Sequence, residues 1–269
     1  GQSKRVTLVK QQINRMGSTI QYASDLHLEF PANKEFLNQY PLQPVGDVLV
    51  LSGDIIPFAV MDKHKDFFSF LSDNFKTTYW LPGNHEYYQF DITEKCGVLH
   101  ESICSNVFLV NNTSVVHENV KLIFSTLWSH ISPNLQWQIE NNLNDFHLIK
   151  YKNQRFSAEQ FNQLHTESLA FIQNELTIKN GEQIAVFTHH CPTFFHYPKQ
   201  YKGSFLNEAF AVELYDLIEL SEIAYWVYGH HHSNVPEFTI GNTKLVTNQL
   251  GYVQKNEHQL FESDRVIKI

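Results

Sequence analysis

Five short apolar runs, each ending abruptly in polar residues, dominate the hydrophobic pattern of this chain. They cover Gly17–Ala23, Val48–Leu51, Thr77–Leu81, Ile184–Phe187 and Ile223–Tyr228. Continuous apolar runs of this length, bounded by Gly and Pro, are typical of strands that are covered on both faces. The pattern therefore predicts strands buried inside a layered protein.

Helical periodicity and hairpin patterns fill the intervals between these runs. Ser157 and Gln160 match a capping box and predict a helix that begins there. We also expect a helix capped by Asn207 and continuing to Ile218, and a shorter one over Asp62–Leu71. Residues 115–126 and 237–248 are typical of hairpins, the second turning at Gly241-Asn242.

The alternation of strands and helices predicts one domain over residues 17–269, with two packed β-sheets flanked by helices. Residues 129–156 interrupt it with a segment rich in Asn and Gln, which we interpret as a cap-like insertion. Residues 1–16 carry the only basic bias and are expected to be a flexible arm.

Composition excludes several classes of function. The net charge of −8, without a long basic block, argues against a general nucleic-acid binder. No apolar stretch approaches the roughly 18 residues that span a bilayer. Cys96, Cys104 and Cys191 lack CxxC spacing, which disfavours a disulfide scaffold or a thiolate zinc site and favours the cytoplasm. The unusual feature is the 15 histidines.

Many of these histidines lie in polar clusters that directly follow the predicted strands. The clusters are Asp25-Leu26-His27, Gly53-Asp54, Gly83-Asn84-His85-Glu86, His189-His190 and Gly229-His230-His231-His232. Strand ends converge on one edge of an α/β sheet, where ligands bind. Carboxylate, amide and imidazole donors without thiolate suit Mn, Fe or Zn. Because side chains alternate along extended backbone, Asp-x-His and His-x-His spacing lets both side chains point the same way.

In order and spacing, these clusters resemble the five-block signature of the calcineurin-like metallophosphoesterases. The resemblance covers residues 25–232 and implies an α/β fold (α+β in some schemes), a four-layer α-β-β-α sandwich of two mixed sheets with a two-metal site at the carboxyl ends of the strands. It assigns the first metal to Asp25, His27, Asp54 and His232, and the second to Asp54, Asn84, His189 and His230.

The same resemblance implies that His85 and Asp54 are the catalytic residues. Asp54 would bridge two divalent metal ions, and a metal-bridging hydroxide would attack the phosphorus of a small phosphoester in line. His85 would contact the phosphate and assist the leaving group. Glu86 is expected to orient its neighbours or to serve as a structural ion pair or cap.

Departures from known subgroups narrow the expected substrate. Pro57 stands where purple acid phosphatases carry a tyrosine, and Pro82 where protein phosphatases carry an arginine. None of the four arginines lies in a motif, which favours a phosphodiester or a small nucleotide or organophosphate over a phosphomonoester dianion. A phosphomonoesterase, a protein phosphatase and a non-catalytic metal-binding module remain alternatives. In style the chain resembles small uncharacterised bacterial members, and the sequence does not indicate an oligomeric state.

Three features have two interpretations. His231 is expected to point away from the metals, whereas His190 either supports the site or contacts substrate. The aromatic and lysine-containing segment 194–202, within the loop 194–205, either packs on the core or holds a base or phosphate.

Overall fold

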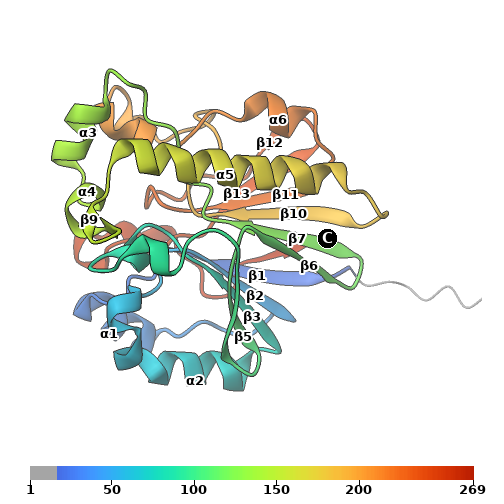
Figure 1. Cartoon of the computed structure of the whole chain (residues 1–269). Helices are drawn as coiled ribbons and strands as arrows, with labels where there is room; N and C mark the ends of the chain where they lie inside the picture. The colour runs from blue at the N-terminus through green and yellow to red at the C-terminus, as the bar shows by residue number, and fades with distance from the viewer. Residues whose placement is uncertain (1–16) are drawn as a thin grey trace, which may run out of the picture.

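The computed structural model describes residues 17–269, which form two six-stranded β-sheets packed face to face with helices on the outer face of each (Figure 1). The strands are β1 Thr19–Ala23, β2 Val48–Ser52, β3 Thr77–Leu81, β4 Leu99–Cys104, β5 Val107–Asn111, β6 Thr113–His117, β7 Val120–Ser125, β8 Lys150–Tyr151, β9 Gln154–Arg155, β10 Gln183–Thr188, β11 Tyr225–Tyr228, β12 Phe238–Ile240, β13 Thr243–Thr247 and β14 Val266–Lys268. The helices are α1 Pro31–Gln39, α2 Lys65–Asn74, α3 Gln136–Asn142, α4 Asp145–Leu148, α5 Ala158–Thr177 and α6 Tyr215–Glu219. The predicted arm, residues 1–16, lies outside the described residues.

The two sheets share one plan. The first sheet has the order β14-β1-β2-β3-β5-β4, and the second sheet has the order β12-β13-β11-β10-β7-β6. In each, four central strands are parallel and the two edge strands are antiparallel. The carboxyl ends of the parallel strands therefore meet at one side of the molecule. This confirms the predicted α/β architecture of two mixed sheets flanked by helices.

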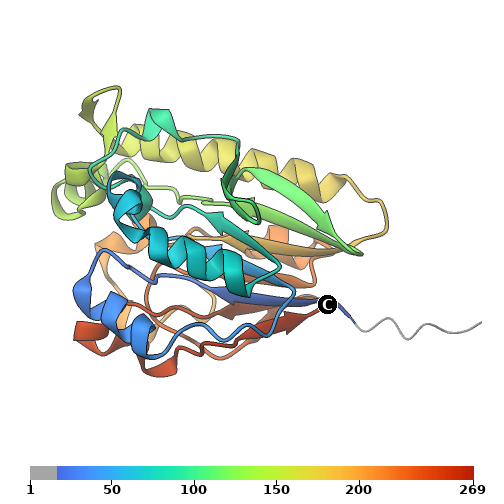
Figure 2. The ribbon, with the colours of Figure 1, turned by 90° about the horizontal axis from the view of Figure 1, so that it is seen from below.

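Both faces of the central strands are buried, which explains their continuous apolar runs. Along β2, Val48 and Val50 point between the sheets, while Leu49 and Leu51 pack with residues of α1 and α2. Figure 2 shows α1 and α2 crossing the outer face of the first sheet. On the other side, Ile172 of α5 packs with residues of the second sheet. The four layers are thus held by one apolar interface between the sheets and one outside each sheet.

Several predicted elements are confirmed. Helix α5 begins at a complete capping box, in which the Ser157 side chain accepts from the backbone N–H of Gln160 and the Gln160 side chain accepts from that of Ser157. Strands β6 and β7 form one predicted hairpin, and β12 and β13 form the other.

Two helix predictions need correction. Residues 58–64 form a 3₁₀ helix and α2 begins only at Lys65, so the predicted helix over Asp62–Leu71 is displaced toward the carboxyl end. The helix predicted from Asn207 to Ile218 is wrong over residues 207–214, and only its last turn is present, as the start of α6 Tyr215–Glu219. A 3₁₀ turn, Phe205–Ala209, follows Ser204 there, because the backbone at Ala211 then pairs with Cys191 and cannot continue a helix.

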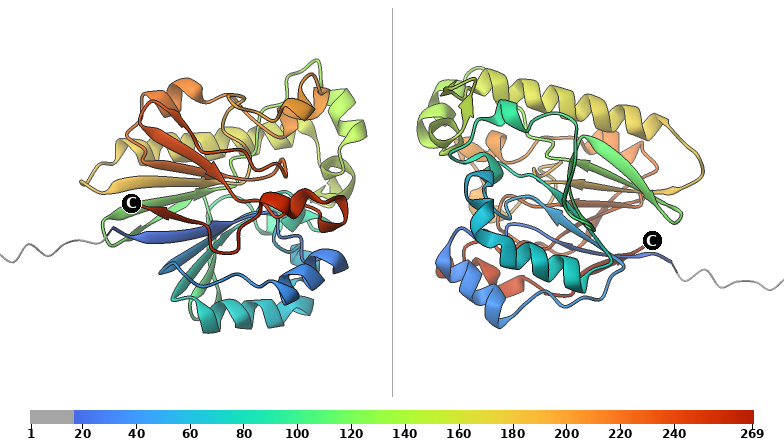
Figure 3. Two further views of the ribbon diagram at one scale, coloured as in Figure 1. Left: turned by 180° about the vertical axis from the view of Figure 1, so that it is seen from behind. Right: turned by 60° about the horizontal axis from the view of Figure 1, so that its bottom comes forward.

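Residues 129–156 form α3, α4 and the small β8–β9 hairpin, which lie beside the first turns of α5 (Figure 1). After β13, the chain makes short 3₁₀ turns at residues 253–260, on the same side of the molecule as residues 129–156. Strand β14 then pairs with β1 (Figure 3). Within residues 17–269, no helix is both long enough and apolar enough to cross a membrane.

Candidate metal centre

The seven predicted metal ligands all lie in loops at the carboxyl ends of parallel strands. Asp25 and His27 follow β1, Asp54 follows β2, Asn84 follows β3, His189 follows β10, and His230 and His232 follow β11. The first sheet therefore supplies four of these side chains and the second sheet three. All are buried except His232, whose side chain is 11% exposed.

The backbone of these loops differs from the expected extended alternation. Five of the seven residues adopt left-handed conformations, with φ of 55° at Asp25, 47° at His27, 55° at Asp54, 79° at His230 and 52° at His232. The side chains of these tight turns point toward one site without the two-residue alternation of an extended strand. Left-handed backbone costs an L-residue roughly 1–2 kcal/mol, so the surrounding contacts hold these loops in a strained form.

Main-chain hydrogen bonds supply part of that support. The N–H of Asp25 donates to the carbonyl of Gly53 at 2.9 Å, and the N–H of His27 donates to the carbonyl of Asp54 at 3.0 Å. The loops after β1 and β2 therefore support one another.

Asp25, His27, Asp54 and His232 form a first donor cluster. Their nearest donor atoms all lie within 4.8 Å of one another. His27 Nε2 is 2.9 Å from His232 Nε2 and 3.7 Å from Asp54 Oδ2, and His232 Nε2 is 3.4 Å from Asp25 Oδ1. These are the four residues that the sequence assigns to the first metal.

Asp54, Asn84, His189 and His230 form a second donor cluster beside the first. His189 Nε2 is 3.1 Å from Asn84 Oδ1, 3.1 Å from His230 Nδ1 and 3.3 Å from Asp54 Oδ1. Asp54 thus presents one carboxylate oxygen to each cluster. This arrangement brings together the four residues that the sequence assigns to the second metal.

Partners outside the clusters fix which atom each donor presents. Glu29 Oε1 lies 3.2 Å from Nδ1 of His27, and Glu257 Oε2 lies 2.8 Å from Nδ1 of His232. When those Nδ1 atoms donate to the two carboxylates, both Nε2 lone pairs point into the first cluster. Two imidazole lone pairs and two carboxylate oxygens then face one small volume, which requires a proton or a cation between them.

The second cluster has equivalent supports. His189 Nδ1 faces the carbonyl of Ser52 at 2.9 Å, and His230 Nε2 faces the carbonyl of Ala209 at 3.3 Å. Asn84 donates from Nδ2 to Asp145 Oδ1 at 2.8 Å, which turns its carbonyl oxygen toward the cluster. Carboxylate, amide and imidazole atoms without thiolate are suitable ligands for divalent Mn, Fe or Zn, so the residues present fit two divalent cations.

Glu29, Asp145 and Glu257 are functional candidates that sequence reasoning missed. Glu29 lies two residues after His27, and this adjacency was the only available signal. Asp145 and Glu257 belong to segments without a motif, and only the folded chain brings them to Asn84 and His232.

Charges within the clusters offset the effect of burial on the pKa values of the buried groups. Burial raises the pKa of a carboxyl group, but the imidazoles of His189 and His85 hold the pKa of Asp54 well below its usual value. Burial lowers the pKa of an imidazole, yet the Asp54 charge raises the pKa of His189 to about 9, and hydrogen bonds to Asp25 and Glu257 raise that of His232 to about 10. The clusters therefore attract positive charge strongly.

Glu86 is a structural clamp on the loop after β2. Its fully buried carboxylate accepts from the N–H groups of Asp54, Ile55 and Gly83 and from Trp80 Nε1, at 2.7–2.9 Å. Burial and the neighbouring Asp54 charge raise its pKa to about 7, whereas four N–H donors favour the ionised form. Three of the four donors are backbone N–H groups, so these contacts are those of the expected cap, and they hold in place the loop that carries Asp54.

His85 lies at the edge of the centre without joining the second donor cluster. Its ring stacks on Tyr88 at 4.0 Å between centroids, and its Nδ1 is 3.1 Å from Glu29 Oε1. Burial alone lowers the pKa of the imidazole, but the charges of Asp54 and Glu29 together outweigh burial and raise it. Glu29 thus links His85 to the first donor cluster through His27.

The remaining two histidines of the five polar clusters, His231 and His190, have separate roles. His231 points away from the donors, as predicted, and its Nδ1 accepts from the N–H of Ser233 at 3.2 Å. Burial lowers its pKa to about 4, so it is neutral. His190 is fully buried against Trp128, Phe161 and His230, with Nδ1 facing the Thr126 carbonyl at 3.3 Å. His190 therefore supports the ring of His230 from behind.

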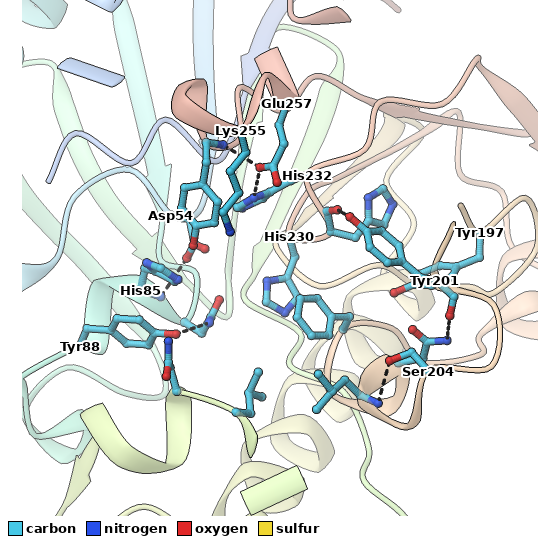
Figure 4. Close-up of a pocket in the computed structure, with 18 residues that line it drawn as sticks. Asp54, His85, Tyr88, Tyr197, Tyr201, Ser204, His230, His232, Lys255 and Glu257 are labelled. Carbon is cyan, nitrogen blue, oxygen red and sulfur yellow. Dashed lines mark hydrogen bonds and ion pairs between the residues drawn. The ribbon is translucent and has the colours of Figure 1, made fainter. Parts of the chain in front are cut away.

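A cavity of about 370 Å³ opens onto both clusters (Figure 4). Asp54, Asn84, His85, His230 and His232 line one part of it. Tyr197, Tyr201 and Ser204 lie across the cavity from Asp54 and His85 (Figure 4). Among the described residues, Lys255 is the only lysine or arginine in the lining.

Some residues of the loop 194–205 reach the cavity and others do not, so the loop combines its two expected roles, packing and contact with the cavity. Tyr197 and Tyr201 reach the cavity, whereas Phe194 and Phe195 are exposed and Lys199 and Lys202 lie outside the lining. Trp128 is buried and packs against Phe156 and Phe161, as expected for a core residue.

Comparison with known proteins gives consistent results. The family model for calcineurin-like phosphoesterases matches residues 19–234. An uncharacterized protein of Acanthamoeba polyphaga mimivirus is 34% identical over 262 residues, covering 87% of this chain and 91% of the viral one. This curated relative is viral, so the expected likeness to bacterial members is not supported by it.

Two solved structures share the fold. A phosphopantetheinyl hydrolase from Mycobacterium tuberculosis has a TM-score of 0.69 at 14% identity, covering 94% of this chain and 96% of that one. A dimetal phosphatase from Danio rerio has a TM-score of 0.53 at 14% identity, covering 86% and 87%. The family match, which spans most of the chain, shows that this chain belongs to the calcineurin-like phosphoesterase family.

Proposed function

We propose that the protein is a binuclear metal-dependent phosphoesterase that hydrolyses a phosphodiester or another small organophosphate such as a nucleotide. The observation that carries this proposal is a pair of buried donor clusters that share Asp54 and open onto one cavity with His85 at its edge. When bound, two divalent cations would neutralise phosphoryl oxygens and increase the acidity of water. Mn, Fe and Zn all suit the donor set.

The chain's own residues have distinct parts in this proposal. Asp25, His27, Asp54 and His232 would hold one cation, and Asp54, Asn84, His189 and His230 the other. His85 would hold a proton at Nε2 and deliver it to the departing oxygen, because its Nδ1 is engaged by Glu29 and its pKa is raised. The aromatic and aliphatic side chains of the cavity would exclude water from the reacting groups.

A diester is favoured over a monoester dianion by the charge of the cavity. Among the residues that line it, no arginine is present, and Lys255 is the only cationic side chain apart from the histidines. A phosphate that carries one negative charge needs fewer positive partners than a dianion. Of the two solved structures that share the fold, one is a phosphopantetheinyl hydrolase and the other a dimetal phosphatase, so both ester classes belong in the test.

The test is hydrolysis by manganese-loaded protein of bis-p-nitrophenyl phosphate, p-nitrophenyl phosphate and a panel of nucleotides. We expect the bis-ester to have the higher kcat/KM. Asp54→Asn should lose at least about 10³-fold in activity together with bound metal, and His85→Asn should lose about 10²–10⁴-fold while retaining metal. Asp66→Asn, at an exposed carboxylate on α2, is the control.

Equal activity of the wild type and Asp54→Asn would overturn the two-metal proposal. A higher kcat/KM for p-nitrophenyl phosphate would overturn the diester preference and leave a phosphomonoesterase. Tight metal binding without hydrolysis of any ester would identify a non-catalytic metal-binding module.

A further inference from the structure

Part of the cavity that opens onto the donor clusters has an uncharged, largely apolar surface. Leu143, Tyr197, Tyr201, Leu206 and Phe210 line it, and we call these five residues the apolar wall. They come from two segments far apart in sequence, the loop between α3 and α4 and the stretch 197–210. A phosphate bound at the donor clusters needs none of these side chains. Leu143, Leu206 and Phe210 pack against the core on one side, and the wall is free to contact another part of the substrate on the other.

Aromatic rings of the wall are held in fixed positions. The Tyr201 hydroxyl donates to the carbonyl of His231 at 3.0 Å, and Tyr197 meets the His231 ring edge-on at 5.5 Å between centroids. Phe210 stacks on the ring of His230 at 4.3 Å, with an interplanar angle of 17°. The loop that carries His230 and His232 thus also anchors the wall through His231. This gives the wall a defined distance from the donor clusters.

Polar groups between the rings are already engaged. Ser204 Oγ accepts from the N–H of Leu206 at 3.3 Å, and Asn207 Nδ2 donates to the carbonyl of Tyr201 at 2.8 Å. No carboxylate belongs to the wall, and the charged members of the lining other than histidines, namely Asp54, Lys255 and Glu257, lie outside it. A surface of rings and leucines without free charge favours an uncharged planar group, which can stack on it.

We propose that the apolar wall binds the organic group of the phosphoester and selects an uncharged aromatic group over an aliphatic one. This proposal rests on the proposed function, because it takes the phosphorus of that ester to lie at the donor clusters. Stacking of one ring on aromatic side chains contributes about 1–3 kcal/mol, which corresponds to about 5–150-fold in affinity.

Three phosphonates test the proposal without turnover, because their P–C bond is not hydrolysed. Methylphosphonate, cyclohexylphosphonate and phenylphosphonate share the same phosphonate group and differ in the attached group, and at a pH above their second pKa all three are dianions. We expect manganese-loaded protein to bind phenylphosphonate at least about tenfold more tightly than either other compound in isothermal titration calorimetry. Equal dissociation constants for phenyl- and methylphosphonate would overturn the wall as a binding site. Equal constants for phenyl- and cyclohexylphosphonate would overturn its aromatic selectivity.

Variants assign the effect to the wall. Tyr201→Ala should abolish the advantage of phenylphosphonate over methylphosphonate, a ratio that a general loss of phosphonate binding does not change, and far-ultraviolet circular dichroism shows that the variant is folded. Tyr201→Phe keeps the ring but loses the bond to His231, so it should reduce the advantage only in part. Phe195→Ala, an exposed aromatic of the same loop that does not line the cavity, is the matched control and should retain it. An unchanged advantage in Tyr201→Ala would contradict the proposal.

The outcome is distinguishable from that of the proposed function. Failure to hydrolyse any ester overturns the function, whereas the ratio of phosphonate affinities decides the wall independently of turnover.

Discussion

Glu29 connects two side chains with different proposed tasks. Its Oε1 faces Nδ1 of His27 and Nδ1 of His85, one a member of the first donor cluster and the other the proposed proton donor. Burial raises the pKa of a carboxyl group, but hydrogen bonds from these two imidazoles lower the pKa of Glu29 to about 2. The Glu29 carboxylate therefore holds the Nδ1 side of both rings, which leaves Nε2 of His27 facing the first donor cluster.

Replacing that charge should weaken both tasks. We expect Glu29→Gln to lower manganese affinity and kcat by about 10–100-fold each, the usual effect of removing a group that orients a metal ligand. Metal titration and steady-state kinetics measure the two losses separately. Glu35→Gln, an exposed glutamate on α1, should change neither. A Glu29→Gln variant with the manganese affinity and kcat of the wild type would contradict the role of Glu29 in orienting the two imidazoles.

Lys255 is the second residue whose role follows from its position. It is exposed at the cavity, and its Nζ lies 4.6 Å from the centroid of the Tyr252 ring, which also packs against His27 and His232. An ammonium group at this place attracts an anionic substrate before the substrate reaches the donor clusters.

Lys255→Met should therefore raise KM by about 3–10-fold with little change in kcat, and the difference from wild type should shrink at high ionic strength. Kinetics at two salt concentrations measure this effect. Lys199→Met, which removes an exposed charge from a residue outside the cavity, should behave as wild type. A fall in kcat without a rise in KM would contradict the attraction of substrate by Lys255.

At the scale of elements, glycines let the loops approach one another. A Cβ on Gly83 would overlap Asp54 Oδ1 and would lie 2.7 Å from Nε2 of His189. Gly53, with φ of +89°, combines left-handed backbone with the same lack of space, because its Cβ would overlap the ring of His189. The clusters can form only because these positions lack side chains.

Gly83→Ala should therefore abolish metal binding, since the added methyl group displaces the two side chains on which the second donor cluster depends. The measurement is metal content after dialysis, alongside far-ultraviolet circular dichroism to show that the fold persists. Gly97→Ala is the matched control. Its Cβ would meet nothing within 4 Å, so it should lose about 1 kcal/mol of stability through its positive φ and keep both metals. Retention of two metals in Gly83→Ala would contradict this packing argument.

The sequence predicted those elements whose cause is local. Apolar runs covered on both faces predicted the central strands, and the Ser157–Gln160 box predicted the start of α5. The polar clusters at the strand ends were visible in the sequence, and the resemblance to the calcineurin-like metallophosphoesterases singled out the seven donors among them. The left-handed turns at Asp25 and His27 were not predictable, because short-range pattern cannot show that neighbouring loops hold the backbone in a strained form.

Long-range contacts explain the remaining differences. The helix predicted from Asn207 fails because the bridge between Ala211 and Cys191 overrides local preference. Asp145 has no motif of its own and acquires its place only when α4 meets the loop after β3. Features of this kind depend on pairs of residues far apart in the chain, which one sequence does not reveal.

At the scale of the molecule, the donor clusters bridge the two sheets. The first donor cluster joins Asp25, His27 and Asp54 of the first sheet to His232 of the second, and the second donor cluster joins Asn84 and Asp54 to His189 and His230. Cations bound there would link the sheets at their carboxyl edge.

Removing the metals should consequently destabilise the whole fold. A ligand at 100 times its dissociation constant stabilises the native state by about 2.7 kcal/mol, and 1 kcal/mol shifts the Tm of a chain this size by about 2–4 °C. We expect EDTA to lower the Tm by about 5–10 °C and added manganese to restore it, as measured by scanning fluorimetry. Asp54→Asn should show no manganese-dependent shift. An EDTA-insensitive wild type that binds two metals would contradict the bridging role.

The bridge between the sheets also has a consequence for the time course of folding. The N–H of His230 donates to the carboxylate of Asp25, which is 205 residues earlier in the chain, and the Asn84 carbonyl faces His189 from 105 residues away. Each cluster takes donors from residues 25–84 and from residues 189–232, so neither half of the polypeptide can assemble the centre alone, and contacts between residues so far apart in sequence form slowly. Cobalt(II) bound at the centre absorbs visible light. The rise of this absorption during refolding would therefore report when the two halves of the chain come together.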